Sequence, residues 1–251
     1  MQQLATAMAQ TKLPALIESK ASESAINCES CQDSGWVVIV GEGAKRCECL
    51  RRKIRQAKLD RIPGIYQGLH LATLTPNPQR HKDQARNLAW LRANPEASYA
   101  FTGNLTGNEP PNAKSNRVGK SLFGWLLYRE AVERNQRTCG LLLSTLLKQF
   151  QAWEMDPDKV PDITPGDLRQ NHTRYFLLID ELDKDRPTEF RAEVLFQLIE
   201  AAHSFKHQLV VTTNYTLDGL ANYWSRNGAA YGPAIVSRIK EQPGGYEVPM
   251  F

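Results

Sequence analysis

The chain has 251 residues, a formal net charge of +4 and a sequence pI near 8.8. This length suffices for one sizeable α/β domain with a small additional module, and the mild basicity permits nucleic acid as a partner without requiring it. No apolar stretch approaches a membrane span, and the amino terminus lacks the basic start and cleavage site of a secretory signal. We therefore expect a cytoplasmic protein with no membrane partner, whose five cysteines are thiols or metal ligands.

The sequence predicts three regions in chain order. Residues 1–60 form an amino-terminal, partner-binding region that contains a cysteine-bearing module at 28–49. Residues 61–97 form a connecting segment, and residues 98–251 form the core. At the end of the first region, LRRKIRQAK places five cations in nine helical residues. Such a run is typical of a solvated helix face, or of a surface for nucleic acid or an acidic partner.

Four cysteines form two close pairs, Cys28-x-x-Cys31 and Cys47-x-Cys49, separated by fifteen residues. Tetrahedral zinc needs four such ligands, and two short loops can supply them without a large core. The intervening QDSGWVVIVGEGAKR is expected to form a β-hairpin, as in zinc-ribbon-like sites. A redox pair is disfavoured because no β-α-β pattern surrounds the first two cysteines. We therefore expect zinc on Cys28, Cys31, Cys47 and Cys49, the alternative being four ordinary buried thiols.

From Ser98 onward, short apolar runs alternate with stretches in which apolar residues recur every three or four positions. This alternation predicts an α/β fold with a mainly parallel sheet covered on both faces. Cys139 lies at a strand start and is expected in the core. The expected strands are YAFT (99–102), Cys139–Ser144, Tyr175–Asp180, Leu209–Thr213 and GYEVP (245–249), and the expected helices lie near 50–61, 83–92, 119–136, 145–156 and 191–205.

One expected strand, in RYFLLIDELDK, ends in two carboxylates, Asp180 and Glu181. The carboxyl edge of a parallel sheet is where α/β folds bind ligands. Asp180 could hold Mg²⁺ through its water shell, and Glu181 could activate a water for attack on a phosphate. The alternative is an acidic turn after a strand.

Gly119-Lys120-Ser121 opens an expected helix and resembles the end of a phosphate-binding loop, G-x-x-x-x-G-K-[ST]. Its backbone N–H groups and the Lys120 ammonium could contact phosphates, and Ser121 could reach Mg²⁺. The first glycine of the motif is missing from its usual place, whereas Gly103 follows the preceding apolar run. We interpret the polar, proline-containing stretch Asn108–Arg117 as an insertion that leaves the loop as a bulge.

A third polar element, Asn214, follows the strand LVVTT and could orient the attacking water. The phosphate loop, the acidic strand end and the polar strand end therefore occur in the order that a nucleotide site needs. We expect a nucleotide with Mg²⁺, bound through Gly103, Gly119, Lys120, Ser121 and Asp180.

These motifs, in this order, resemble the AAA+ ATPases of the bacterial helicase-loader family, which includes DnaC, DnaI and the transposition helper IstB. GKSLFGWLLYREAVERNQ is similar to Walker A with its helix, FLLIDE to Walker B and VVTTNY to sensor 1. The resemblance begins near Ile62, in IPGIYQGLHLATL, and the cysteine module looks like one in some loader-like proteins. It implies an AAA+ P-loop core with a mainly parallel sheet, preceded by a small zinc-binding module.

GPAIVSRIKE is similar to the segment that carries the family's arginine finger, which implies that role for Arg238. A finger acts on the γ-phosphate of a neighbouring subunit, so the resemblance implies a homo-oligomer on ATP binding. A surface arginine is the alternative. The core is expected to lack the helical lid of larger AAA+ proteins, as loaders do. The catalytic set implied is Glu181, Asn214 and Arg238.

The resemblance implies that the protein loads a hexameric replicative helicase onto single-stranded DNA, with ATP hydrolysis as the switch. The amino-terminal region would bind the helicase. Two other hypotheses stay open: an IstB-like transposition helper, and an adaptor whose split phosphate loop binds nucleotide without hydrolysing it.

The stretch STLLKQFQAWEMDPDK lies where loaders carry a helix that grips single-stranded DNA. There Lys148, Phe150 and Trp153 could supply charge and stacking. Leu146, Leu147, Phe150 and Trp153 also have helical spacing, so core packing is an equal alternative.

Overall fold

A computed structural model describes most of the chain. It divides into two compact units, Met1–Ala57 and Lys58–Phe251. Residues 1–27, and with them the start of the expected helicase-binding region, lie outside the described residues, as does the expected insertion Asn108–Arg117. The described ranges are 28–41, 43–76, 83–106, 119–170, 173–226 and 230–250.

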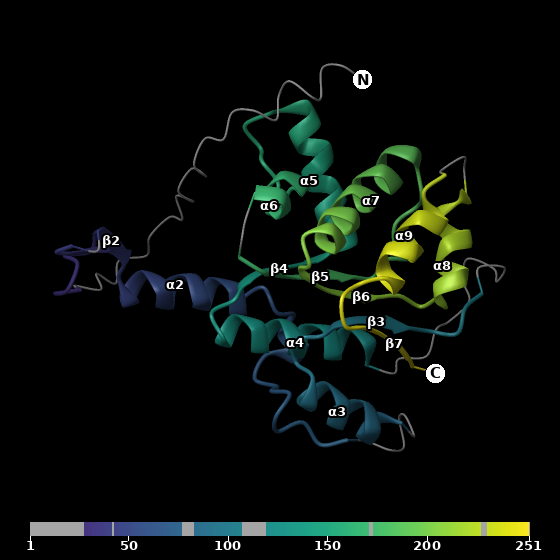
Figure 1. The fold of residues 1–251 in the computed structure, drawn as a ribbon, viewed down its shortest axis with the longest axis horizontal. Helices are drawn as coiled ribbons and strands as arrows, with labels where there is room; N and C mark the ends of the chain where they lie inside the picture. The colour runs from purple at the N-terminus through teal and green to yellow at the C-terminus, as the bar shows by residue number, and fades with distance from the viewer. Residues whose placement is uncertain are drawn as a thin grey trace. The chain divides into compact units, whose positions relative to one another are not determined.

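The first unit contains a two-stranded antiparallel hairpin, β1 (Trp36–Ile39) and β2 (Gly43–Arg46), followed by helix α2 (Glu48–Leu59) (Figure 1). The hairpin expected between the cysteine pairs is confirmed. Its register places Trp36 opposite Arg46 and Val38 opposite Ala44. Helix α2 begins slightly earlier than its basic run, and none of its residues is buried. This unit therefore has little apolar interior of its own.

The second unit is built on a five-stranded parallel sheet with the strand order β4-β5-β6-β3-β7. The mainly parallel α/β fold is thereby confirmed. One boundary was expected wrongly: the strand predicted over Cys139–Ser144 ends at Leu142, because the apolar run continues into a helix whose first residue, Leu143, is buried. The strands are β3 (Ser98–Thr102), β4 (Arg137–Leu142), β5 (Tyr175–Asp180), β6 (Gln208–Thr212) and β7 (Gly245–Pro249).

Helices cover both faces of this sheet (Figure 1). No helix among the described residues combines the length and the hydropathy needed to cross a membrane. One face carries α3 (Gln84–Ala93) and α4 (Lys120–Glu133), with a short 3₁₀ helix, η2 (Gly64–Tyr66), near α4. The other carries α5 (Leu143–Met155), α6 (Pro165–Gln170), α7 (Glu189–Ser204), α8 (Leu217–Trp224) and α9 (Gly232–Lys240).

The core consists of two apolar layers separated by the sheet. Alternate residues of β5 point to opposite layers: Phe176 and Leu178 pack against α4, whereas Leu177 and Ile179 pack on the α7 side. Burial on both faces explains why the strand is a continuous apolar run. Cys139 is buried, as expected. In α5, Leu146, Leu147 and Phe150 are also buried, which supports core packing for that stretch, while Lys148 is exposed.

Candidate nucleotide site and metal centre

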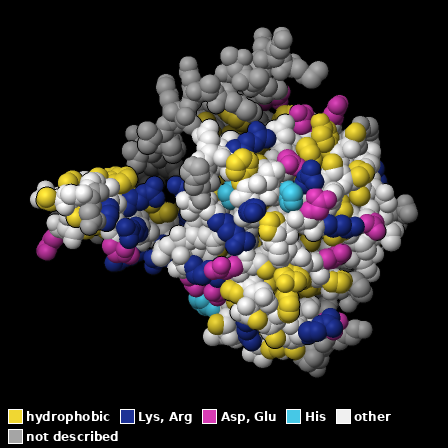
Figure 2. Space-filling view, viewed as in Figure 1, with side chains coloured by type: hydrophobic (Ala, Val, Ile, Leu, Met, Phe, Trp, Pro, Cys, Tyr) yellow, Lys and Arg dark blue, Asp and Glu magenta, His cyan; other side chains and the backbone are white. Residues whose placement is uncertain are grey.

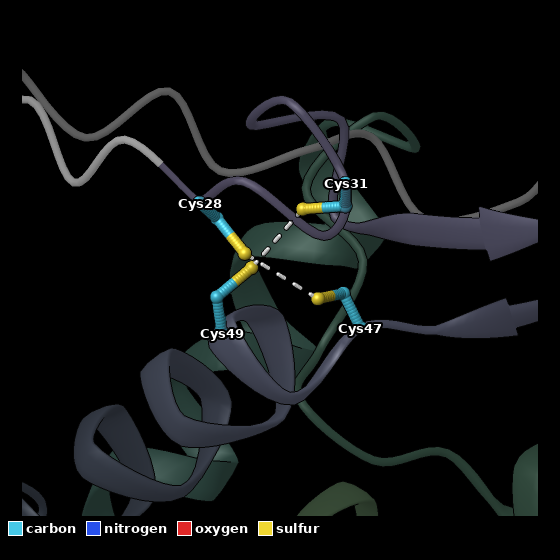
Figure 3. Close-up of side chains that lie close together, drawn as sticks. All are labelled: Cys28, Cys31, Cys47 and Cys49. Carbon is cyan, nitrogen blue, oxygen red and sulfur yellow. Dashed lines mark hydrogen bonds between the residues drawn. The ribbon is translucent and has the colours of Figure 1, made fainter.

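The four cysteines of the first unit converge on one point (Figure 3). All four Sγ atoms lie within 4.8 Å of one another. The Cys28 and Cys47 sulfurs are 3.6 Å apart, and those of Cys31 and Cys49 are 3.3 Å apart. A tetrahedral ion with metal–sulfur bonds of about 2.3 Å separates its ligands by roughly 3.8 Å. The cluster therefore has the size of a four-thiolate metal site, and these cysteines could hold a metal ion.

Tight backbone turns bring the two cysteine pairs together. Gln32 and Asp33 adopt left-handed conformations, with φ of 47° and 62°, and the Gln32 N–H donates to the Cys28 carbonyl at 2.7 Å. The Asp33 carboxylate accepts the Cys28 N–H at 2.9 Å. The Cys47 N–H donates to the Gly35 carbonyl at 2.7 Å, which ties the second pair to the first turn. The hairpin fixes the spacing between the pairs.

The thiols of this cluster do not ionise independently. Hydrogen bonds, chiefly with the Cys31 thiol, lower the pKa of Cys28 to about 7. The pKa of Cys49 is raised to about 12, again chiefly through its hydrogen bond with Cys31. One thiolate therefore forms readily, but four together need a cation to balance them.

In the second unit, helix α4 begins at the carboxyl edge of the sheet. Gly119 caps the helix with a φ of 94°, a left-handed conformation that a side chain would strain. Lys120 is the first helical residue and is 8% exposed. Burial lowers the pKa of its ammonium, and the nearby Asp183 carboxylate acts in the opposite direction. The helix N-terminus and this cation would attract a phosphate.

The Asp180 carboxylate lies at the end of β5, beside the start of α4. Its Oδ1 atom accepts a hydrogen bond from Ser121 Oγ at 2.9 Å and a short one from the Thr212 hydroxyl. Its Oδ2 atom accepts from Trp125 Nε1 at 2.9 Å. Asp180 is almost fully buried, and these three donors fix its orientation. Ser121 and Asp180 thus present adjacent hard oxygen ligands of the kind that Mg²⁺ prefers.

Glu181 adopts an unusual backbone conformation at this edge. Its φ is 61°, in the left-handed region that glutamate seldom enters. Its N–H donates to Thr212 Oγ1 at 2.9 Å, so that one threonine holds both carboxylate residues. Burial raises the pKa of the Glu181 carboxyl, and the Asp180 charge adds to the effect. A half-buried carboxylate with a raised pKa suits a general base.

Asn214, just beyond β6, is held by Asp183. The Asn214 backbone N–H donates to Asp183 Oδ1 at 2.8 Å, and its Nδ2 donates to Oδ2 at 2.7 Å. Because a carboxylate only accepts, these bonds fix which side of the amide faces Asp183. The amide nitrogen faces that carboxylate, so the Asn214 oxygen is directed away from it.

Gly103 lies against the same segment. A Cβ atom at this position would lie 2.1 Å from the Asn214 carbonyl oxygen. The Gly103 N–H donates to the Tyr215 carbonyl at 3.1 Å, and Leu105 forms a parallel bridge with Tyr215. Close backbone approach therefore requires glycine here, and it joins the start of the phosphate loop to the segment that carries Asn214.

Arg238 lies away from this edge of its own chain. It forms a short hydrogen bond to Glu200 and an ion pair of 2.7 Å with Glu241. Glu200 belongs to the last third of α7. This helix follows the carboxyl end of β5 and precedes the amino end of β6. Arg238 is thus not joined to the Lys120 group by these contacts, which are with Glu200 and Glu241.

Six of the expected residues gather at one edge: Gly103, Gly119, Lys120, Ser121, Asp180 and Glu181, with Asn214 close by. Sequence reasoning missed three of their partners, Trp125, Thr212 and Asp183. Trp125 had a signal, since it lies one helical turn after Ser121. Thr212 ends the strand beside Asp180, and Asp183 lies in the same acidic DELD run.

Neither a family model nor a curated protein matches the sequence. The fold, however, is similar to solved structures. A crystal structure of DnaI aligns with a TM-score of 0.53 at 13% identity, over 76% of this chain and 92% of that chain. The DnaC helicase loader aligns with a TM-score of 0.53 at 19% identity, over 75% of this chain and 99% of that chain.

A third similar structure is AMPPCP-bound DnaA from Aquifex aeolicus, with a TM-score of 0.52 at 12% identity, over 76% of this chain and 51% of that chain. At such low identities the likeness establishes the fold. The expected α/β core with a mainly parallel sheet is thereby confirmed as a fold similar to those of DnaI and the DnaC helicase loader, and a cysteine cluster that could hold a metal precedes it in the chain.

Proposed function

We propose that this protein is an ATP-binding AAA+ protein that loads a replicative helicase onto single-stranded DNA, with ATP hydrolysis as its switch. One observation carries the proposal: Lys120, Ser121, Asp180 and Glu181 meet at the carboxyl edge of a core whose fold is that of the DnaC helicase loader. The AMPPCP bound to DnaA of the same fold supports a nucleotide as ligand.

In this proposal, the N-terminus of α4 and Lys120 bind the β- and γ-phosphates. Ser121 and Asp180 would hold Mg²⁺, and the hydrogen bonds from Trp125 and Thr212 keep Asp180 oriented for it. When bound, the ion would neutralise charge that develops on the transferred phosphoryl group. These residues orient the nucleotide before any bond breaks.

The hydrolytic step would use Glu181 and Asn214. Glu181 accepts the proton of the attacking water, and its raised pKa suits that role near neutral pH. The Asn214 amide oxygen accepts a hydrogen bond from the same water, because its nitrogen is engaged by Asp183. Asp183 is thus a positioning residue that acts through Asn214.

Two further assignments belong to this proposal. Zinc is the metal of the cysteine cluster, since four thiolates at this spacing are typical of structural zinc sites. Arg238 acts on the γ-phosphate of a neighbouring subunit, so that turnover needs a homo-oligomer that forms on ATP binding. This assignment rests on the similarity of GPAIVSRIKE to the segment that carries the arginine finger in helicase loaders.

Mixing two inactive variants tests the action in trans. Lys120→Ala lacks phosphate binding and Arg238→Ala lacks the finger, so a mixed assembly would contain some intact shared sites. We expect partial recovery of ATP turnover on mixing, measured by phosphate release. No recovery at any ratio would refute a finger acting between subunits.

The loading function is tested with the replicative helicase of the native host. We expect the protein to capture that helicase in a pull-down and to increase helicase occupancy on single-stranded DNA in an ATP-dependent way. The Glu181→Gln variant should capture the helicase but fail to complete loading. Capture of a transposase instead would favour the transposition helper. Unchanged loading by Lys120→Ala and Glu181→Gln would favour a non-hydrolysing adaptor.

A further inference from the structure

The hairpin of the first unit exposes one complete face. Trp36, Val38, Ala44 and Arg46 share this face, because each lies opposite another member of the set in the β1–β2 register. All four are exposed, and the large apolar ones markedly so: Trp36 is 48% exposed and Val38 is 77% exposed. An apolar face of this kind on a small polar module marks an interaction site. We call these four residues the hairpin face.

Basic side chains of β2 and α2 accompany this face in the same unit. The Arg46 guanidinium lies 5.9 Å from the centre of the Trp36 ring, so aromatic surface and positive charge are presented together. Lys45 is exposed on the same strand but projects from the opposite face of the hairpin, and α2 adds exposed cations in its first two turns, Arg51, Arg52 and Lys53. In the view of Figure 2, the lobe formed by β1, β2 and α2 displays apolar and basic side chains next to one another.

Among the residues of this unit that the structure describes, the acidic groups are fewer. Glu48 in α2 lies 4.0 Å from Arg51, which offsets part of its charge. Glu29 and Asp33 belong to the metal-binding turn rather than to the hairpin face, and Asp33 accepts the Cys28 N–H. The hairpin and the start of α2 therefore favour a polyanion.

We propose that the hairpin face, with the cations of α2, is a binding site for single-stranded nucleic acid. A tryptophan on a flat exposed strand can stack with an unpaired base, and the basic side chains can contact the phosphates on either side. Duplex DNA fits less well, since its bases are stacked inside and leave nothing for Trp36 to contact. A protein partner would use the apolar residues but, unless it were acidic, would leave Arg46 and the exposed cations of α2 without a matching role.

This site is independent of the nucleotide chemistry of the core. Its affinity for DNA is present without ATP, whereas any grip that the core contributes under the proposed function depends on nucleotide. The two contributions can therefore be separated in one protein.

The test measures fluorescence anisotropy of a labelled oligothymidylate of about 20 nucleotides, longer than common single-strand site sizes. The full-length, zinc-loaded protein carries Lys120→Ala and is kept free of nucleotide. We expect Trp36→Ala to weaken binding about 10-fold or more, the scale of one lost stacking contact. Trp36→Phe, which keeps a ring, should restore most of the affinity.

Trp90→Ala is the matched control, because Trp90 is 44% exposed but belongs to α3 of the second unit. It should leave the affinity unchanged. Zinc content and circular dichroism check that each variant is folded, and exposed Trp36 is not needed for packing.

Salt dependence provides a second readout. Replacing Arg51, Arg52 and Lys53 together by glutamine keeps the helix but removes three cations, so the slope of log affinity against log salt should become shallower by about 2. An unchanged affinity for Trp36→Ala with an unchanged salt slope for the triple variant would overturn the proposal. So would a Trp36→Ala protein that keeps DNA affinity but loses capture of a helicase, since the face would then belong to a protein partner.

Discussion

The cysteine module and the proposed nucleotide edge of the core both bring polar side chains together, but they stabilise those side chains in opposite ways. Among the described residues up to Ala57, the buried side chains are Cys31 and Cys47. The nucleotide edge instead lies on two apolar layers, and its buried Asp180 is held by three hydrogen bonds from the protein itself. We therefore expect the module to depend on a metal ion for its fold, and the core to be folded before its proposed ligand binds.

Removing the metal should unfold the cysteine module and leave the core unaffected, which is the largest difference expected between the two regions. We expect a chelator to unfold residues 28–57 and leave the second unit folded, because structural zinc contributes about 10–16 kcal/mol to such modules. Hydrogen exchange followed by mass spectrometry would show protection lost across residues 28–57 and kept in the second unit. Cys139→Ala, which alters the one cysteine outside the cluster, should keep the metal. A hairpin that stays protected without metal would contradict the comparison.

A cavity in the core should have the converse effect. Phe123 in α4 is fully buried and lies 5.9 Å from the ring of Phe101. Phe123→Ala should destabilise the second unit by about 3–5 kcal/mol in urea unfolding while leaving zinc content unchanged. Phe205→Ala is the control, since Phe205 is exposed and its loss should cost less than about 0.5 kcal/mol. Equal effects of the two substitutions would mean that α4 does not pack as described.

Glu181→Gln should change chemistry without changing either fold. We expect kcat for ATP to fall by about 10²-fold with KM nearly constant, the scale of losing a positioned base. In the wild type the base must be ionised, so kcat falls as pH drops through the Glu181 pKa. Burial raises that pKa, so the decline begins at a higher pH than an exposed glutamate would give. The control is Glu189→Gln, because Glu189 is exposed, and kcat should stay unchanged in that variant. A parallel rise in KM would show that Glu181 binds nucleotide instead.

The smallest effect is expected for Asp183→Asn. This change weakens the hold on Asn214, and we expect kcat to fall about 10-fold, near the lower limit for a hydrogen bond to a charged group. It also removes the charge that raises the pKa of Lys120. The alkaline limb of activity should therefore move to lower pH. Asp218→Asn, at an exposed carboxylate, should show neither effect. A drop in kcat without this shift of the alkaline limb would show that Asp183 acts through Asn214 and not on Lys120.

Much of this organisation could be predicted from the sequence, because it depends on local patterns. Apolar runs ending in Asp180 or Asn214 indicate strands and their carboxyl ends, and the cysteine spacing indicates the cluster. The boundary after Leu142 could not be predicted, since Leu143 is buried whether it continues the strand or starts a helix. Contacts across the sheet, such as Trp125 and Thr212 with Asp180, depend on how helix α4 and two strands are placed in three dimensions.

The left-handed backbone of Glu181 has a consequence for the history of the chain. Glycine and asparagine adopt this conformation with less strain, so Glu181→Gly should stabilise the fold modestly, by about 1 kcal/mol. Where the Glu181 carboxylate is not needed, substitutions at this position would therefore favour glycine or asparagine. In a lineage that had lost hydrolysis, a stabilising substitution at this position would be expected early.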